Sequence, residues 1–166
     1  MASITLDWNE YLKKSTEVVE EGCVLLENKN QCLPFAKDAK VAIFGRIQKH
    51  YYKSGTGSGG MVNVSKVIDI VEGLKSTNHI EIDEELEKLY EKWEESNPFE
   101  QGIGWGAEPW SQVEMPISYE EAKYYAEKND VALLIIGRTA GEDKDNGTFE
   151  GSWFLTETEK NLLKNL

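Results

Sequence analysis

The hydrophobic and polar positions of this chain follow two patterns, one typical of buried strands and one typical of amphipathic helices. Continuous apolar runs at Val41–Gly45 and Val131–Gly137 predict two buried strands. Apolar residues at helical spacing predict four helices: Asp7–Glu21, Ser65–Lys75, Asp83–Ser96 and Ser118–Lys128. A further helix is predicted to begin at Thr156. Strands that are apolar throughout belong to parallel sheets covered by helices, so the pattern indicates an α/β fold.

Capping residues mark where several of these helices start. Three pairs have the spacing of a capping box, in which the first side chain and a glutamate three residues later bond each other's backbone: Asp7 with Glu10, Ser118 with Glu121, and Thr156 with Glu159. Asp83 can cap its helix, where Glu84 and Glu85 suit the positive end of the helix dipole. Asn97–Pro116 contains glycines, prolines and two tryptophans without periodicity, which predicts a long loop.

The order of these elements predicts the fold class, a three-layer α/β/α sandwich with a mostly parallel sheet. The chain has the length of one domain, residues 1–166. Only two or three strands are convincing in the sequence, whereas a doubly wound sheet usually has about five. We therefore expect the chain to be an incomplete portion of a larger domain.

Composition and charge exclude several classes of partner. The net charge of −12 and the pI of about 4.7 argue against nucleic acid and anionic membranes, which call for clustered Lys and Arg. No apolar run approaches the roughly 20 residues of a membrane span, and no secretory leader is visible, so a cytoplasmic location is expected. Cys23 and Cys32 lack partners at metal-ligand spacing, so we expect reduced thiols, no bound metal and no cofactor.

Both predicted strands end in the dipeptide Gly-Arg. Each leads into a loop that is a candidate for binding or catalysis. Val41–Gly45 is followed by the glycine loop, Lys53–Gly60, and Val131–Gly137 by an acidic loop. The acidic loop carries Glu142, Asp143, Asp145 and Glu150. If the two strands are parallel neighbours, their carboxyl ends coincide and the two loops face each other across one crevice.

Each loop has more than one interpretation. The glycine loop lacks the terminal Gly-Lys-Ser/Thr of a phosphate-binding loop, so close approach of its backbone to a ligand or another domain is favoured. By composition the acidic loop is a solvated turn around Asn146-Gly147, and it lacks the full set of ligands of a calcium-binding EF-hand loop. Alternatively, one of its carboxyl groups is a general acid/base held at the end of a rigid strand.

Three segments, taken together and in this order, form a recognisable set. Glu21–Phe35 reads EGCVLLENKNQCLPF, Lys40–Gly60 contains KVAIFGR and GTGSGG, and Ile136–Thr156 reads IGRTAGEDKDNGTFEGSWFLT. They resemble the E-x-x-V-L-L-K-N segment, the first strand with its G-S-G-S-G loop, and the S-G-E-G-x-D-R segment of family 3 glycoside hydrolases. In that family, which includes β-glucosidases and β-xylosidases, these motifs belong to the α/β sandwich domain. The resemblance covers most of Val18–Leu166.

The resemblance implies a function that composition does not show. Members of the family join a (β/α)8-type barrel to this sandwich domain, and the sugar binds between the two. The barrel supplies an aspartate nucleophile, and a glutamate on a loop of the sandwich domain is the acid/base. By position this glutamate is Glu142, the family's following aspartate is Asp145, and the arginine at the strand end is Arg138.

The chain departs from the family pattern at three positions of this loop. Asp143 replaces a glycine, Asn146 replaces an arginine, and Ser152 replaces an aspartate. The usual pairing of acid and arginine is therefore altered, and Asp143 and Glu150 stay open as alternatives to Glu142. Aromatic side chains that could stack on sugar rings, or pack in the core or against a barrel, are Trp105, Trp110, Trp153 and Phe154.

The sequence thus leads to one principal hypothesis and two alternatives. The resemblance implies part of a retaining β-glycosidase that hydrolyses terminal β-linked sugars. Since a barrel needs roughly 250 residues, none fits in this chain, and we expect it after the sandwich domain or on a separate polypeptide. The first alternative is a non-catalytic α/β binding or interaction domain, whose acidic loop is only a surface turn. A flavodoxin-like receiver or nucleotide-binding domain is the second.

Overall fold

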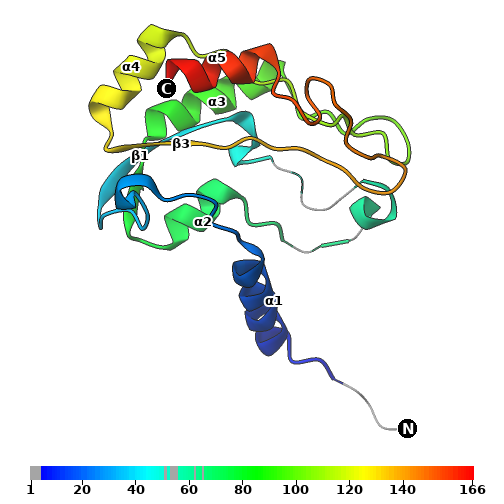
Figure 1. Ribbon diagram of the computed structural model, residues 1–166. Helices are drawn as coiled ribbons and strands as arrows, with labels where there is room; N and C mark the ends of the chain where they lie inside the picture. Colours follow the sequence, from blue (N-terminus) through cyan, green and yellow to red (C-terminus); the bar gives the residue numbers. More distant parts are fainter. Residues whose placement is uncertain (1–4, 51, 53–55, 62, 65) are drawn as a thin grey trace, which may run out of the picture. The chain divides into compact units, whose positions relative to one another are not determined.

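The computed structural model describes the chain apart from residues 1–4, 51, 53–55, 62 and 65 (Figure 1). The chain divides into two units, residues 1–35 and residues 36–166. The first contains helix α1 (Trp8–Gly22), close to its predicted bounds, and none of the residues of α1 is buried. Asp7 caps α1 by accepting hydrogen bonds from the backbone N–H groups of Asn9 and Glu10. A short 3-10 turn, Lys29–Gln31, follows.

The second unit is built on a parallel sheet of three strands. Its strands are β1 (Ala39–Phe44), β2 (Ile80–Ile82) and β3 (Val131–Leu134), in the spatial order β2-β1-β3. Val41 is in register with both Ile82 and Val131, and Phe44 with Leu134. The two strands predicted from apolar runs are therefore parallel neighbours, as the interpretation of the two loops required. Strand β2 was not predicted, because its three residues alternate apolar and polar and are too few to show a pattern.

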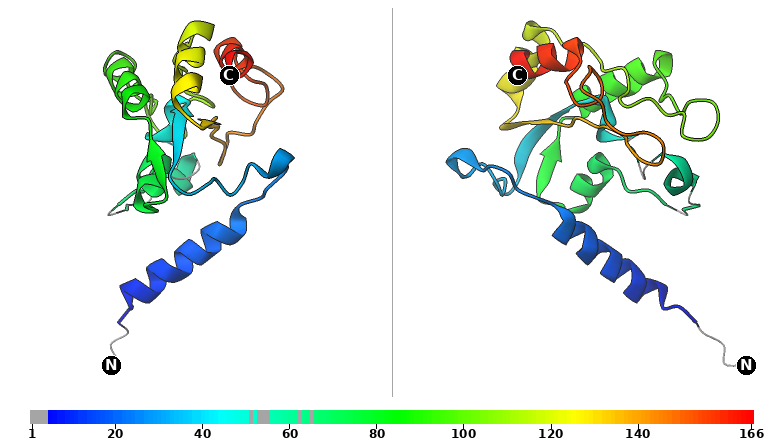
Figure 2. Two further views of the ribbon diagram at one scale, coloured as in Figure 1. Left: turned by 90° about the vertical axis from the view of Figure 1, so that its left-hand side faces the viewer. Right: turned by 45° about the vertical axis from the view of Figure 1, so that its right-hand side comes forward.

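Helices lie on both faces of the sheet (Figure 1). Three helices, α3 (Glu84–Ser96), α4 (Tyr119–Lys128) and α5 (Glu157–Asn165), lie on one side, and α2 (Ile70–Ser76) lies on the other. Figure 2 shows the same separation from two further sides. The main core lies between β1 and the three helices, and it consists of Ala42, Phe44, Leu86, Tyr90, Met115, Ile117, Ala122, Tyr125 and Leu162. This is the predicted α/β/α sandwich, in the form of a partial domain.

The structure corrects two details of the prediction. Ser65, the predicted first residue of a helix, lies outside the described residues, and the helix itself begins at Ile70, because the side chain of Asp69 accepts the N–H of Glu72 and starts the helix there. The run Val131–Gly137, predicted to be a buried strand, is only partly buried, since β3 pairs with β1 along one edge and no described strand pairs with the other. The capping boxes at Ser118 and Thr156 are confirmed in full. None of the described helices is long and apolar enough to cross a membrane.

Candidate functional site

Each of the two Gly-Arg strand ends packs closely against the segment that contains the other. Gly45 has a φ of 98°, and a Cβ atom there would lie 2.0 Å from the backbone oxygen of Ile135. A Cβ atom on Gly137 would lie 2.6 Å from Cγ2 of Ile47. Glycine at both positions therefore lets the exits of β1 and β3 run side by side, and this directs the two following loops to the same edge of the sheet.

The glycine loop and the acidic loop meet, as the sequence predicted. The backbone N–H of Thr56 donates to the oxygen of Ala140 at 3.3 Å, and Thr56 forms a parallel bridge with Gly141. A Cβ atom on Gly141 would lie 2.7 Å from the backbone nitrogen of Thr56, so the two backbones are in close contact. The first part of the predicted glycine loop, 53–55, lies outside the described residues.

Glu142 lies at this junction with its carboxyl group exposed. Its Oε2 accepts hydrogen bonds from Ser58, one from Oγ at 2.6 Å and one from the backbone N–H at 3.2 Å. These bonds favour the ionised form, and they hold the pKa of Glu142 below its usual value. Gly57, with a φ of 74°, makes room, because a Cβ atom there would lie 2.7 Å from Cβ of Glu142. Glu142, the acid predicted from the sequence, is thus held by hydrogen bonds from the glycine loop.

The long loop 97–116 is fastened to the acidic loop. The buried Lys144 donates from its ammonium group to the backbone oxygen of Glu108 and lies 4.3 Å from the centre of the Trp110 ring. In return, Nε1 of Trp110 donates to the backbone oxygen of Asp145 at 3.2 Å. The backbone N–H of Thr139 also donates to the oxygen of Trp110 at 2.9 Å. These contacts of the long loop therefore hold the backbone of the acidic loop in place.

Arg138 makes its described contacts with the segment that follows the acidic loop. Its guanidinium group bonds both carboxylate oxygens of Glu159 at 2.6 Å, and its Nε donates to the backbone oxygen of Ser152 at 2.8 Å. Burial raises the pKa of Glu159, but the bonds from Arg138 and from Thr156 outweigh it, and the pKa is lowered. Arg138 thus connects the end of β3 to the start of α5, and its guanidinium group positions the loop between them.

The remaining predicted residues are spread around the loop. Asp143 is exposed and has a left-handed backbone with a φ of 58°, and the side chain of Asp145 is exposed. Glu150 bonds Lys160 of α5 at 2.8 Å. Trp153 is 73% exposed. The structure therefore brings Glu142 to the glycine loop and places the other acids elsewhere on the acidic loop.

Two of the departures from the family pattern lie against each other. The Oγ of Ser152 donates to Oδ1 of Asn146 at 3.1 Å and accepts the backbone N–H of Gly147 at 2.9 Å. A neutral hydrogen-bonded pair therefore occupies the positions where the resemblance in the sequence led us to expect an arginine and an aspartate. This pair closes the turn between the acidic loop and α5 without a charge.

Sequence reasoning missed a buried cluster around Glu114. The Glu114 carboxyl group accepts the backbone N–H groups of Arg46 at 3.0 Å and Met115 at 2.9 Å. Burial outweighs these bonds and raises the pKa of Glu114 to about 7. The Arg46 side chain, 1% exposed, has its guanidinium carbon 5.3 Å from the centre of the Trp93 ring. A glutamate between two apolar residues, Val113 and Met115, was the only signal in the sequence.

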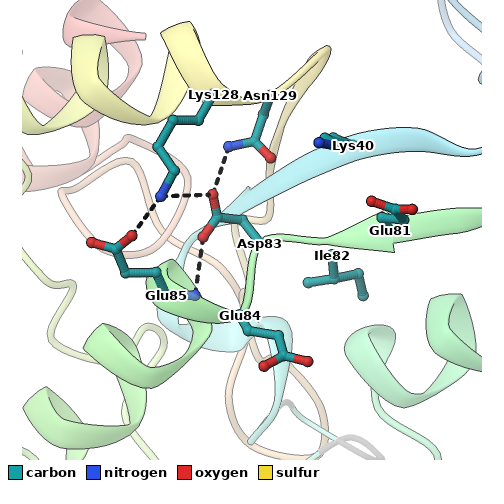
Figure 3. Close-up of a pocket in the computed structure, with 8 residues that line it drawn as sticks. All are labelled: Lys40, Glu81, Ile82, Asp83, Glu84, Glu85, Lys128 and Asn129. Atoms are coloured by element: carbon teal, nitrogen blue, oxygen red, sulfur yellow. Dashed lines mark hydrogen bonds and ion pairs between the residues drawn. The ribbon is translucent and has the colours of Figure 1, made fainter.

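A hollow lies away from these loops, beside the amino-terminal end of β1 (Figure 3). It has a volume of about 290 Å³. Three of its charged side chains form one cluster, since Nζ of Lys128 lies 2.5 Å from Glu85 and 3.9 Å from Asp83, and Asn129 donates to Asp83 at 2.7 Å. The cluster joins the start of α3 to the end of α4. Among the residues that the structure describes, no three His, Cys, Asp or Glu side chains are grouped so that they could hold a metal ion.

Comparison with known proteins shows the family. Residues 23–166 match the family described as the glycosyl hydrolase family 3 C-terminal domain. The chain belongs to glycosyl hydrolase family 3. It is 52% identical over 161 residues to a β-glucosidase of Ruminococcus albus, which covers 97% of this chain and 17% of that protein. Family 3 membership confirms the resemblance found in the sequence.

Solved structures of family 3 enzymes share the fold. A β-glucosidase from Paenibacillus barengoltzii superposes with a TM-score of 0.91 at 46% identity, covering 99% of this chain and 18% of that one. β-Glucosidase 3B from Thermotoga neapolitana, solved in complex with α-D-glucose, gives a TM-score of 0.83 at 31% identity, with 98% of this chain and 22% of that one covered. This family 3 chain therefore spans about a fifth of the length of the relatives that it matches.

Proposed function

We propose that this chain supplies the acid/base glutamate, Glu142, of a retaining β-glycosidase that hydrolyses terminal β-linked sugars. The position of Glu142 carries the proposal, because its exposed carboxyl group lies where the loop after β3 meets the glycine loop. The same position matches the family's acid/base glutamate in the sequence. The relatives of the chain are β-glucosidases, which makes a β-glucoside the expected substrate.

The mechanism divides the reaction between two carboxyl groups about 5–5.5 Å apart. An aspartate of the barrel attacks the anomeric carbon and forms a glycosyl–enzyme intermediate, while Glu142 donates a proton to the departing oxygen. Glu142, now a carboxylate, then accepts a proton from the water that hydrolyses the intermediate. Because the nucleophile belongs to a barrel domain, we expect no glycosidase activity from the 166 residues alone.

The pKa of Glu142 must change when the site is assembled. In this chain the bonds from Ser58 lower the pKa of Glu142, which suits the base of the second step and opposes the acid of the first. A barrel seated over the two loops would exclude water and bring the carboxylate of the nucleophile close. Both effects raise the pKa of a neighbouring carboxyl group. Glu142 therefore becomes a competent acid only in the assembled enzyme.

Two neighbouring acids are rivals for the same role, and their surroundings favour Glu142. Glu150 forms an ion pair with Lys160 at 2.8 Å, and this pair joins it to α5. Asp143 follows Glu142 directly, but no hydrogen bond from the glycine loop reaches its carboxyl group among the contacts of the described residues. Of the three, Glu142 alone is held by the described part of the glycine loop.

A chimera tests the proposal. This chain would replace the matching segment of the Ruminococcus albus β-glucosidase, to which it is 52% identical, so that a barrel is present. Glu142→Ala should lower kcat/KM by at least about a hundredfold for cellobiose, whose leaving group needs a proton, because general acid catalysis contributes about 10²–10⁴-fold. Hydrolysis of 2,4-dinitrophenyl β-glucoside, whose leaving group departs without a proton, should slow much less in the glycosylation step.

Matched variants separate Glu142 from its neighbours. Glu150→Ala and Asp143→Ala should leave the ratio of the two substrates unchanged. Added azide should restore turnover of the dinitrophenyl substrate by Glu142→Ala and yield β-glucosyl azide, because azide attacks the intermediate without a general base. Equal losses on both substrates, or azide rescue of Glu150→Ala instead, would assign the acid/base role elsewhere.

A further inference from the structure

Glu142 lies at the tip of a tight turn. Gly141 and Lys144 form an antiparallel bridge, in which the backbone N–H of each donates to the oxygen of the other, at 3.2 Å from Gly141 and 3.0 Å from Lys144. Glu142 and Asp143 are the two residues between them, and the left-handed φ of 58° at Asp143 allows the chain to reverse there. The contacts that fix the two ends of this turn therefore also fix the position of Glu142.

Each end of the turn is held by a different segment of the chain. Gly141 forms a parallel bridge with Thr56 of the glycine loop. The side chain of Lys144 is buried, and its ammonium group donates to the backbone oxygen of Glu108 and lies 4.3 Å from the centre of the Trp110 ring. Both of these partners belong to the long loop, so Lys144 anchors the turn to that loop.

The surroundings of Lys144 give its ammonium group a structural reason to be buried. Lysine is seldom buried, because an ammonium group taken out of water costs free energy unless a partner replaces the water. The ring face of Trp110 is one such partner, and Nε1 of the same ring donates to the backbone oxygen of Asp145 at 3.2 Å. The long loop therefore holds two consecutive residues, Lys144 and Asp145, directly after the turn.

Proton transfer makes this anchor relevant to the reaction. A general acid must lie within hydrogen-bond reach of the oxygen that it protonates, and a small displacement of a catalytic group lowers the rate strongly. We propose that Lys144 is a positioning residue for Glu142: by anchoring the turn to the long loop, it keeps the carboxyl group bonded to Ser58 and within reach of the glycosidic oxygen. The proposal rests on the assignment of Glu142 as the acid/base.

A double-mutant cycle in the 166-residue chain tests the position of Glu142 directly. Lys144→Met keeps a long side chain but removes the ammonium group. If the turn then moves away from Ser58, Ser58→Ala should no longer raise the pKa of Glu142, as it should in the parent chain. Loss of the positive charge alone would leave the effect of Ser58→Ala intact. The same upward change of the pKa in both backgrounds, measured by NMR titration, would overturn the proposal.

The chimera with the Ruminococcus albus β-glucosidase tests the consequence for the reaction. Lys144→Met should lower kcat/KM for cellobiose, whose leaving group needs a proton, by about tenfold to a hundredfold. For 2,4-dinitrophenyl β-glucoside, whose leaving group departs without a proton, the loss should be no more than about threefold. In the Glu142→Ala background, Lys144→Met should cause no further loss on cellobiose, because the carboxyl group that it positions is already absent.

The matched control is Lys123→Met, the same substitution at an exposed lysine of α4, which should change kcat/KM for neither substrate. Equal losses on both substrates in Lys144→Met would overturn the proposal, and so would a loss on cellobiose that persists in full in the Glu142→Ala background. Either result would mean that Lys144 acts on the enzyme by a route other than Glu142.

The assignment of Glu142 can fail separately from that of Lys144. If Glu142→Ala shows no difference between the two substrates and no rescue by azide, the acid/base is another residue. The double-mutant cycle with Ser58→Ala still decides in that case whether Lys144 positions Glu142, because it reports on the carboxyl group without any catalytic turnover.

Discussion

Ser58 donates two hydrogen bonds to one carboxylate oxygen of Glu142, from Oγ at 2.6 Å and from the backbone N–H at 3.2 Å. This contact joins residues 84 positions apart in the chain and ties the loop after β1 to the loop after β3. Two residues of the glycine loop position Glu142. Gly57 leaves room for its side chain, and Ser58 binds its carboxylate. The described part of the glycine loop thus supports the candidate acid.

Removal of the Ser58 hydroxyl group should raise the pKa of Glu142. In Ser58→Ala the stronger of the two bonds to the carboxylate is lost, so the ionised form is less favoured and the pKa moves up toward its usual value. Titration of the Glu142 carboxyl carbon by NMR in the 166-residue chain measures the change. Ser58→Thr keeps a hydroxyl group and should keep the lowered pKa. An unchanged pKa in Ser58→Ala would mean that the contact is absent in solution.

Substitution of Gly45 should destabilise the sheet. Gly45 has a φ of 98°, and the added Cβ of Gly45→Ala would lie 2.0 Å from the oxygen of Ile135, so β1 and β3 would have to separate at their carboxyl ends. We expect a loss of about 3 kcal/mol or more in the free energy of unfolding, measured with urea. Gly59→Ala is the matched control, because an added Cβ meets nothing within 4 Å there. A cost below about 1 kcal/mol for Gly45→Ala would contradict the close approach of the strands.

The ion pair of Arg138 and Glu159 should contribute strongly to stability. Both side chains are largely buried, and Arg138→Gln would leave the Glu159 carboxylate without its bidentate partner. We expect a loss on the order of 3 kcal/mol in the free energy of unfolding. Because the pKa of Glu159 is lowered in the folded chain, this contribution should fade as the pH falls through that lowered value.

An exposed ion pair provides the comparison for Arg138. Lys160→Gln removes the bonds to Glu150 and Glu157 on the surface of α5 and should change the free energy of unfolding far less than Arg138→Gln does, because water screens exposed ion pairs. Similar losses for Arg138→Gln and Lys160→Gln would show that the buried pair contributes no more to stability than the exposed one.

Glu114 should make the chain less stable as the pH rises from about 4.5 to about 7. Over this interval the buried Glu114, whose pKa is raised from 4.5 to about 7, holds a proton that it loses in the unfolded chain. The unfolded state then binds fewer protons, so stability falls with pH, by an amount on the order of 3 kcal/mol. The facing groups are Arg46, Tyr90 and Glu159, of which Arg46 favours the charged carboxylate and Glu159 opposes it.

Glu114→Gln isolates this contribution, because an amide does not titrate. The free energy of unfolding of the parent chain minus that of Glu114→Gln should fall between pH 4.5 and pH 8 and stay constant above that. A difference that does not depend on pH would place the pKa of Glu114 near its unfolded value, 4.5.

Much of the fold was present in the sequence as local pattern. The apolar runs at β1 and β3 predicted parallel neighbours, and the start signals at Asp83, Ser118 and Thr156 set the first residues of three helices. Strand β2 was missed, because three alternating residues become a strand only when β1 offers its backbone. The helix predicted over Ser65–Lys75 begins later, at Ile70, for a related reason, since apolar residues at helical spacing continue in front of Asp69, which caps the helix.

The candidate site was predicted in outline and completed by tertiary contacts. The repeated Gly-Arg strand ends correctly predicted that the two loops meet, and position in the family motif selected Glu142. The sequence did not decide whether Arg138 positions the substrate or the loop. In the structure its guanidinium group binds the carboxylate of Glu159. Nor did the sequence distinguish the exposed Trp105 from Trp110, whose ring packs against Lys144, because which ring is exposed depends on how a loop without periodicity folds.

The sequence by itself determined five of the helices, the strands β1 and β3 with their parallel arrangement, and the presence of a glutamate on a strand-end loop. These features follow from local spacing, which a chain carries along its own length. Only the tertiary structure decided the partners of each side chain: Ser58 for Glu142, Glu159 for Arg138, and Trp110 for Lys144. Such contacts join residues far apart in the chain, and they form only where packing of the sheet and its loops brings those residues together.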